Sequence, residues 1–246
     1  MPQACWVSGC CGSPPRHGDV VALTHRRAVA GAASVTADLR EATGIAAAMA
    51  KVDPTLVVHA AYAKDRELVV DATRHVVDAA NAVGAHVLFI STDAVFLGDG
   101  CARDEQSAPN ATWDYGRWKA SAESIVLDGA EHSAIVRLPL LVSIDPDDHV
   151  VREIRAAAEN GMRTRWFTDE MRQPTFASDV AAAIGAIIES AGQPDNCDRP
   201  RDIAFSDARA RHGRLASVPH CLSRSPPGAA RKRCAERQRS TAHWSP

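Results

Sequence analysis

A short apolar run, Val87-Leu88-Phe89-Ile90, leads directly into three polar residues, Ser91, Thr92 and Asp93. The run is too short for a helix and rich in strand formers, so it predicts a buried parallel strand. In open α/β sheets, ligands bind just beyond the carboxyl ends of the strands. The sequence therefore predicts that the two hydroxyls and the carboxylate lie at the ligand-binding edge of a parallel sheet.

Other apolar runs of strand length alternate with stretches of helical length, the pattern of an α/β protein with a parallel sheet. The expected strands cover residues 19–23, 55–59 and 134–139, and the expected helices cover residues 41–51, 66–83 and 149–160. Gly161 ends the last of these helices, and Ser178-Asp179-Val180 opens another. We predict a doubly wound, mostly parallel sheet with helices on its faces, without internal repeats.

The composition indicates an ordinary globular protein, with 46% apolar and 24% charged residues. No apolar run approaches the ~18 residues of a membrane span, and the start lacks a basic segment followed by an apolar core. We therefore expect a cytoplasmic protein without a membrane partner. The seven cysteines are scattered and lack metal-site spacing, so we expect reduced thiols and no metal site.

The end of the chain differs in charge from the rest. Residues 208–246 carry nine Lys/Arg and one acid, a net +8, so with −2 overall the other 207 residues carry −10. This basic stretch has no apolar periodicity, which predicts a disordered tail. A nucleic-acid-binding tail is the alternative, but its one aromatic residue, Trp244, is too few for base stacking, and we expect no nucleic-acid partner.

After a loop rich in Gly, Asp and Pro, Tyr115 and Lys119 are four residues apart. On a helix, two residues with this spacing share one face. A cation beside a phenol lowers its pKa from ~10 towards neutrality, and such a tyrosine can exchange protons with a carbonyl or an alcohol. The same spacing also arises by chance on many helices, so by itself it leaves both interpretations open.

The order of these motifs is more specific than any one of them. Phe89-Ile90-Ser91-Thr92-Asp93, then Pro109-Asn110, then Tyr115-Gly116-Arg117 with Lys119, resembles the extended short-chain dehydrogenase/reductases, in the branch that includes dTDP-4-dehydrorhamnose reductase. The resemblance runs from about Asp19 to about Glu189. It implies reduction of a keto group on a nucleotide-linked sugar by NAD(P)H. The usual aromatic residue after Thr-Asp is Ala94 here, which leaves the particular sugar open.

The resemblance also implies roles for individual residues. Tyr115 would donate the proton, Lys119 would lower the pKa of Tyr115 and hold the nicotinamide ribose, and Thr92 would orient the carbonyl oxygen. Asp93 and Arg172 would lie on the substrate side, with Arg172 at a nucleotide phosphate. As a surface arginine, Arg172 would need no such role.

The expected cofactor site begins with Gly9 and Gly12, where a first strand at residues 4–9 leads into a turn that resembles the front half of the family's glycine-rich pyrophosphate-binding motif. The third glycine is replaced by Pro15, and only residues 13–18 separate Gly12 from the next strand. A parallel crossover through a helix needs about ten or more residues, so we expect a shortened first crossover. The segment is either a loop or a damaged cofactor site.

Other cofactor contacts follow the next strands. Arg26 would suit the 2′-phosphate of NADP, with NAD as the alternative cofactor and a solvated basic turn as the alternative interpretation. Asp38 and Leu39 would lie against the adenine, although Asp38 is also a typical helix-start residue. Ala60 and Ala61 are small residues at a strand end, where the family places the cofactor close to the backbone.

We therefore expect a Rossmann-like NAD(P)-binding domain over residues 1–190, with a reduced substrate segment at about 140–180, and an aperiodic tail over residues 191–246. The expected partner is a nucleotide sugar, and a homodimer is compatible with the sequence. The alternatives are a non-catalytic family member that binds a nucleotide or a protein partner, and a truncated remnant.

Overall fold

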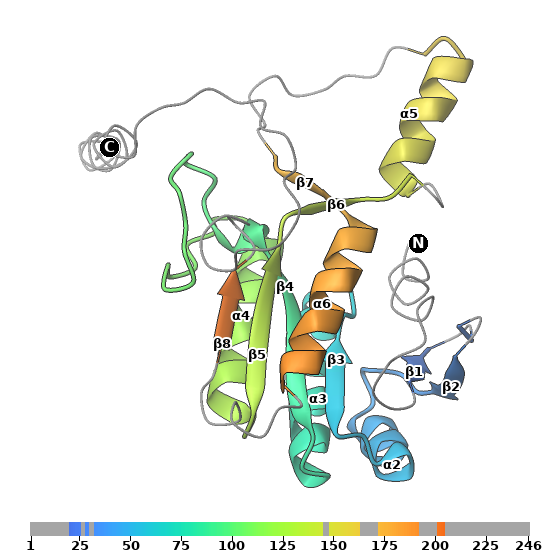
Figure 1. Cartoon of the computed structure of the whole chain (residues 1–246), viewed down its shortest axis with the longest axis vertical. Helices are drawn as coiled ribbons and strands as arrows, with labels where there is room; N and C mark the ends of the chain where they lie inside the picture. Colours follow the sequence, from blue (N-terminus) through green and yellow to red (C-terminus); the bar gives the residue numbers. More distant parts are fainter. Residues whose placement is uncertain are drawn as a thin grey trace.

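The centre of the fold is a four-stranded parallel sheet with the strand order β3-β4-β5-β8 (Figure 1). Its strands are β3 (Leu56–His59), β4 (His86–Thr92), β5 (Ser133–Leu138) and β8 (Arg201–Ala204). Two further parallel pairs join β1 (Val21–Thr24) to β2 (Ala33–Thr36), and β6 (Leu140–Val142) to β7 (Pro174–Phe176). The computed structural model describes residues 20–25, 28–29, 32–144, 148–162, 172–191 and 201–204.

Helices cover both faces of the central sheet. Val87 and Phe89 of β4 pack in a cluster with α3 (Ala72–Ala82) and α4 (Asp114–Gly129). Leu88 and Ile90 point to the other face and pack against α6 (Ala177–Ala191). Because successive strand residues point to opposite faces, a strand that is apolar at every position must be buried on both. The predicted doubly wound, mostly parallel sheet is confirmed.

A smaller apolar cluster joins the β1–β2 pair to the body of the fold. Ile45 and Met49 of α2 (Ala42–Val52) pack against Val76 of α3. Leu23 of β1 and Val57 of β3 lie against this cluster. The cluster therefore connects β1 with β3, the edge strand of the central sheet.

The helix expected over residues 66–83 divides into two parts. It begins as a π-helical turn, η1 (Glu67–Asp71), and continues as α3. The helix expected over residues 149–160 is α5 (His149–Glu159), where the Asp148 side chain accepts from Val151 N at 2.8 Å and caps the start. Gly161, which follows with φ 61°, confirms the predicted stop.

Two strands differ from the sequence prediction. β2 was not expected, because Val35 is the only large apolar residue in it. The expectation that residues 191–246 lack regular structure is wrong at β8, which pairs in parallel with β5 from Ala134↔Arg201 to Arg137↔Ala204. Backbone pairing with a buried neighbour produces this strand despite a weak local pattern. The expected first strand, at residues 4–9, and most of the tail lie outside the described residues.

The structure adds three findings to the compositional predictions. None of the helices in the described residues is long and apolar enough to cross a membrane. In the same part of the chain, no group of three or more His, Cys, Asp or Glu side chains could hold a metal ion. Cys101 is disulfide-bonded, so the expectation of reduced thiols is wrong for this residue. Spacing along the chain does not reveal which cysteines approach each other in the fold.

Candidate active site

The start of α4 lies against the turn that follows β4, and Gly116 makes this approach close. A Cβ at Gly116 would clash with Ala94 O, and it would lie 2.5 Å from Ala111 Cβ and 2.7 Å from Trp113 Nε1. Ala94 belongs to η2 (Asp93–Val95), which directly follows Thr92. The absence of a side chain at Gly116 therefore allows Tyr115 to lie beside the carboxyl end of β4.

We expect Gly116→Ala to lower stability by about 1–3 kcal/mol, because the added methyl group must push the start of α4 away from η2. The measurement is chemical denaturation. The control is Gly185→Ala in α6, where an added Cβ meets nothing within 4 Å and the higher helix propensity of alanine should be neutral or stabilising. Equal stability of Gly116→Ala and the wild type would show that the two segments can separate without cost.

Lys119 lies one turn after Tyr115 on the same face of α4 and is 5% exposed. Its ammonium group donates a hydrogen bond to Ile90 O at 2.8 Å and lies 4.2 Å from the centroid of the Phe89 ring. Burial lowers the pKa of Lys119 to about 8, against an opposing effect of the Glu123 carboxylate. The lysine is therefore anchored to β4 and remains largely cationic below this pH.

Tyr115 is largely buried, and burial raises the pKa of its phenol, followed by the effects of Tyr62 and Asp93. The expectation that Lys119 lowers the pKa of Tyr115 is wrong in this structure. Desolvation is the largest cause of the raised pKa, and the Lys119 ammonium group donates to Ile90 O. Tyr62, at the end of β3, meets the Tyr115 ring edge-on with a centroid distance of 5.8 Å. At neutral pH the Tyr115 phenol therefore retains its proton.

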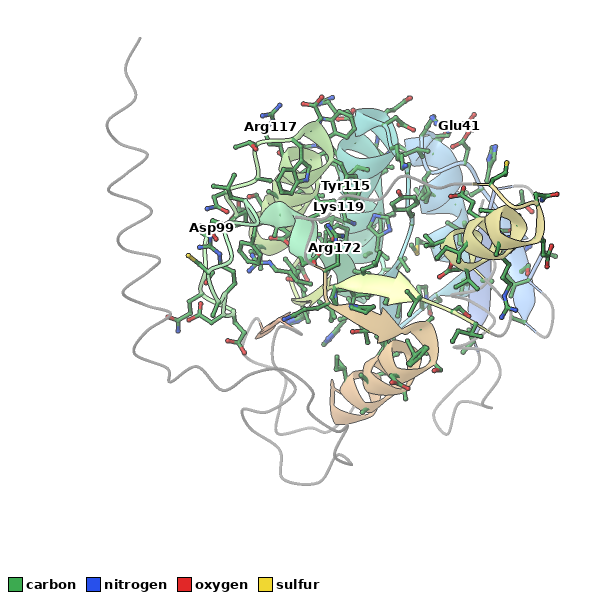
Figure 2. The ribbon with its side chains drawn as sticks, turned by 90° about the horizontal axis from the view of Figure 1, so that it is seen from above. Glu41, Asp99, Tyr115, Arg117, Lys119 and Arg172 are labelled. Atoms are coloured by element: carbon green, nitrogen blue, oxygen red, sulfur yellow. The ribbon has the colours of Figure 1, made fainter. Side chains whose placement is uncertain are left out.

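Thr92, at the end of β4, is held by local hydrogen bonds. Its hydroxyl donates to Asp93 Oδ1 and accepts from Ala94 N, each at 3.2 Å. Asp93 Oδ1 also lies 3.8 Å from Arg172, two residues before β7. Figure 2 shows the labelled Tyr115, Lys119 and Arg172 grouped near the centre of the view, whereas Glu41 and Asp99 lie towards its sides. The structure thus brings together the residues predicted for catalysis and for substrate binding.

On the side predicted for the cofactor, Ala60 is exposed and Ala61 is half-buried at the carboxyl end of β3. Asp38 accepts from Arg40 N at 3.0 Å and lies 3.7 Å from His25, while Leu39 O accepts from His75 Nδ1 at 3.0 Å. The predicted contacts Gly9, Gly12 and Arg26 lie outside the described residues.

The sequence prediction missed a buried histidine beneath the site. His59 Nε2 donates to Thr73 Oγ1 at 3.0 Å, since that hydroxyl donates to Val69 O at 2.7 Å. Burial, and then the charge of Lys119, lower the pKa of His59 to about 3. A histidine at the end of an apolar run was the available signal, but only the fold shows that it is fully enclosed.

This histidine should make the protein labile to acid. Between the unfolded pKa of ~6.5 and about 3, the unfolded chain binds a proton at this position and the folded chain does not, so stability is lost as pH falls. We expect a loss of up to ~1.4 kcal/mol per pH unit below pH 6.5. His59→Gln should flatten this slope in denaturation series between pH 7 and 4.5. His75→Gln on α3 is the control, and equal slopes in the His59→Gln variant and the wild type would contradict the assignment.

The parallel sheet, with Thr92, Tyr115 and Lys119 near its carboxyl edge, defines a Rossmann-like protein. The family model described as the RmlD substrate binding domain matches residues 15–198, and the chain belongs to this family. The matched span begins after Gly12.

Two curated relatives share part of this sequence. The chain is 25% identical over 169 residues to methionine adenosyltransferase 2 subunit beta of Xenopus tropicalis, which covers 62% of this chain and 50% of that protein. It is 30% identical over 124 residues to dTDP-4-dehydrorhamnose reductase of Mycobacterium tuberculosis, which covers 48% of this chain and 40% of that protein. The chain thus spans about half the length, or less, of these relatives.

Solved structures show the same fold. A hypothetical dTDP-4-dehydrorhamnose reductase from Sulfolobus tokodaii superimposes with a TM-score of 0.69 at 19% identity, covering 82% of this chain and 72% of that one. The dTDP-4-dehydrorhamnose reductase from Bacillus anthracis, solved in complex with NADP, gives a TM-score of 0.59 at 24% identity, covering 71% and 64%. At these identities the likeness establishes the fold.

Proposed function

We propose that this chain is an oxidoreductase that reduces a keto group on a nucleotide-linked sugar with NADPH, with NADH as the alternative cofactor. The observation that carries the proposal is the position of the protonated Tyr115 and the cationic Lys119 beside the carboxyl end of β4. Membership of the RmlD family and the NADP in the Bacillus anthracis structure support it.

The described residues on the cofactor side fit a dinucleotide. The small side chains of Ala60 and Ala61 leave the backbone accessible at the end of β3, next to the Tyr62–Tyr115 ring pair. Asp38, two residues after β2, would contact the adenosine end with the carboxylate that now accepts from Arg40 N. Small residues at strand ends allow the close backbone approach that dinucleotides need. We assign these residues, with Lys119 at the nicotinamide ribose, to cofactor binding.

A bound nicotinamide cofactor would supply the hydride, and the residues of this chain would supply orientation and a proton. Thr92 Oγ1 would orient the carbonyl oxygen of the sugar, and the Tyr115 phenol would donate a proton to that oxygen as negative charge develops on it. Lys119, anchored at Ile90 O, would hold the nicotinamide ribose with its ammonium group. Arg172 would bind a phosphate of the nucleotide, where Asp93 now lies 3.8 Å away.

A direct assay tests this proposal. The purified chain is mixed with NADPH and a dTDP-linked 4-keto sugar, and cofactor oxidation is followed by absorbance while the sugar product is followed by mass spectrometry. We expect NADPH loss and a product two mass units heavier, each requiring both substrates. Cofactor oxidation without a reduced sugar, or no reaction at saturating concentrations of both, would contradict a reductase function.

A second candidate is a non-catalytic subunit that binds a protein partner. The specific observation in its favour is that the match to a methionine adenosyltransferase subunit, over 169 residues, is longer than the match to the reductase, over 124 residues. Binding of a methionine adenosyltransferase catalytic subunit, measured by sedimentation, together with no reductase turnover, would favour this candidate.

A further inference from the structure

A buried carboxylate extends the face of α4 that carries the proposed catalytic residues. Glu123 follows Tyr115 and Lys119 at intervals of four residues, so all three lie along one side of the helix. Its side chain is 2% exposed. Ser91 Oγ donates to Glu123 Oε1 at 2.5 Å, while Arg137 donates from Nε to Oε1 at 3.0 Å and from Nη2 to Oε2 at 2.8 Å.

The two partners of Glu123 come from neighbouring strands at the same register position. Ser91 of β4 is paired with Arg137 of β5, and Thr92 follows Ser91 directly. Glu123 therefore joins α4 to both strands at the point where β4 reaches the site. A two-point contact from the Arg137 guanidinium fixes the orientation of the carboxylate as well as its distance.

Arg137 also contacts the loop between η2 and α4. Its Nη1 donates to Ser107 O at 3.3 Å, and its guanidinium carbon lies 5.2 Å from the centroid of the Phe96 ring. The network of Ser91, Glu123 and Arg137 thus contacts the strand that carries Thr92, the helix that carries Tyr115 and Lys119, and the loop that connects them.

We propose that Glu123, held by Arg137 and Ser91, is a positioning residue that fixes the Tyr115–Lys119 face of α4 against the end of β4. The inference rests on the proposed reductase function for its catalytic meaning. Stability alone is a weak reason for such a network, because replacing a whole buried ion pair by apolar residues is often neutral or stabilising. The Glu123 carboxylate also opposes the effect of burial on Lys119 and so helps to keep that amine charged.

The first arm of the test needs no turnover. The titration of the Lys119 amine is followed by NMR in the wild type, in Glu123→Gln and in the double variant Glu123→Leu/Arg137→Met, with Lys119→Met to assign the resonance. We expect the pKa of Lys119 to fall by about one unit in Glu123→Gln, which removes a negative charge, and to fall less in the double variant, which removes a carboxylate and a guanidinium together. The matched control is Arg66→Gln, which removes an exposed ion pair with Asp71, and it should leave the titration unchanged.

The second arm measures kinetics. Because a displacement of about 1 Å can lower a rate about 100-fold, we expect kcat to fall by about that factor in both variants, with KM for the sugar nucleotide little changed. The double variant should remain folded. If wild-type turnover is absent, the proposed function fails, and the Lys119 titration still tests whether Glu123 acts on Lys119.

Three outcomes would overturn the inference. The first is a Lys119 titration that does not move in Glu123→Gln. The second is full recovery of kcat in the double variant, which would show that only the packing volume matters. The third is failure of the double variant to fold, because the network would then be required by the fold itself.

Discussion

Tyr115→Phe should lower turnover by a factor of about 10²–10⁴, the usual contribution of a positioned acid or base, and leave KM for the sugar nucleotide little changed. The phenylalanine ring can occupy the same space beside the Tyr62 ring. The variant therefore removes the hydroxyl group but keeps most of the packing contacts. The raised pKa of Tyr115 means that the donor is protonated throughout the neutral range. Steady-state rates with NADPH and a keto sugar nucleotide are the measurement.

Tyr62 provides the control variant, because it is the only other tyrosine in the chain. Tyr62→Phe retains the edge-on ring contact and should keep turnover within a few-fold of the wild type. Wild-type rates in the Tyr115→Phe variant would remove Tyr115 from the mechanism. A pH profile adds a second check, since Lys119 loses its charge above about pH 8 and the rate should decline there.

The central strands and the Tyr-Lys pair could be predicted because their signals are local. Four consecutive apolar residues, Val87 to Ile90, can be buried only if both faces of the strand are covered, and β4 is covered on both. A spacing of four residues places Tyr115 and Lys119 on one face of any helix. Both patterns can be recognised from residues that lie close together in the sequence.

The remaining features depend on contacts between distant segments. The partnership of Glu123 with Arg137 depends on the register of β5 against β4, which no local pattern encodes. β8 depends on pairing with β5. The direction of the Tyr115 pKa shift was predicted wrongly because the spacing showed the nearby cation but not the depth of burial.

The first crossover expected from the sequence determines the affinity that we predict for the cofactor. β1 begins at Val21, so eight residues separate Gly12 from it, fewer than the ten or more that a helical crossover needs. In intact dinucleotide-binding folds, a glycine turn leads into a helix whose first N–H groups bind the pyrophosphate at the positive end of the helix dipole. From the sequence we predict that eight residues that include Pro14 and Pro15 are too few for this turn and helix together.

We therefore expect this chain to bind NADPH more weakly than an intact relative by about two to four orders of magnitude. Losing two charge-assisted hydrogen bonds to the pyrophosphate, at about 1.5–3 kcal/mol each, accounts for this range. Calorimetric titration with NADPH and with NADH measures it, and a preference for NADPH would support the assignment of Arg26 to the 2′-phosphate. A micromolar or tighter dissociation constant would show that the cofactor site is intact. A millimolar constant would place the deficit in the pyrophosphate site, and turnover should then rise with NADPH concentration well beyond the micromolar range.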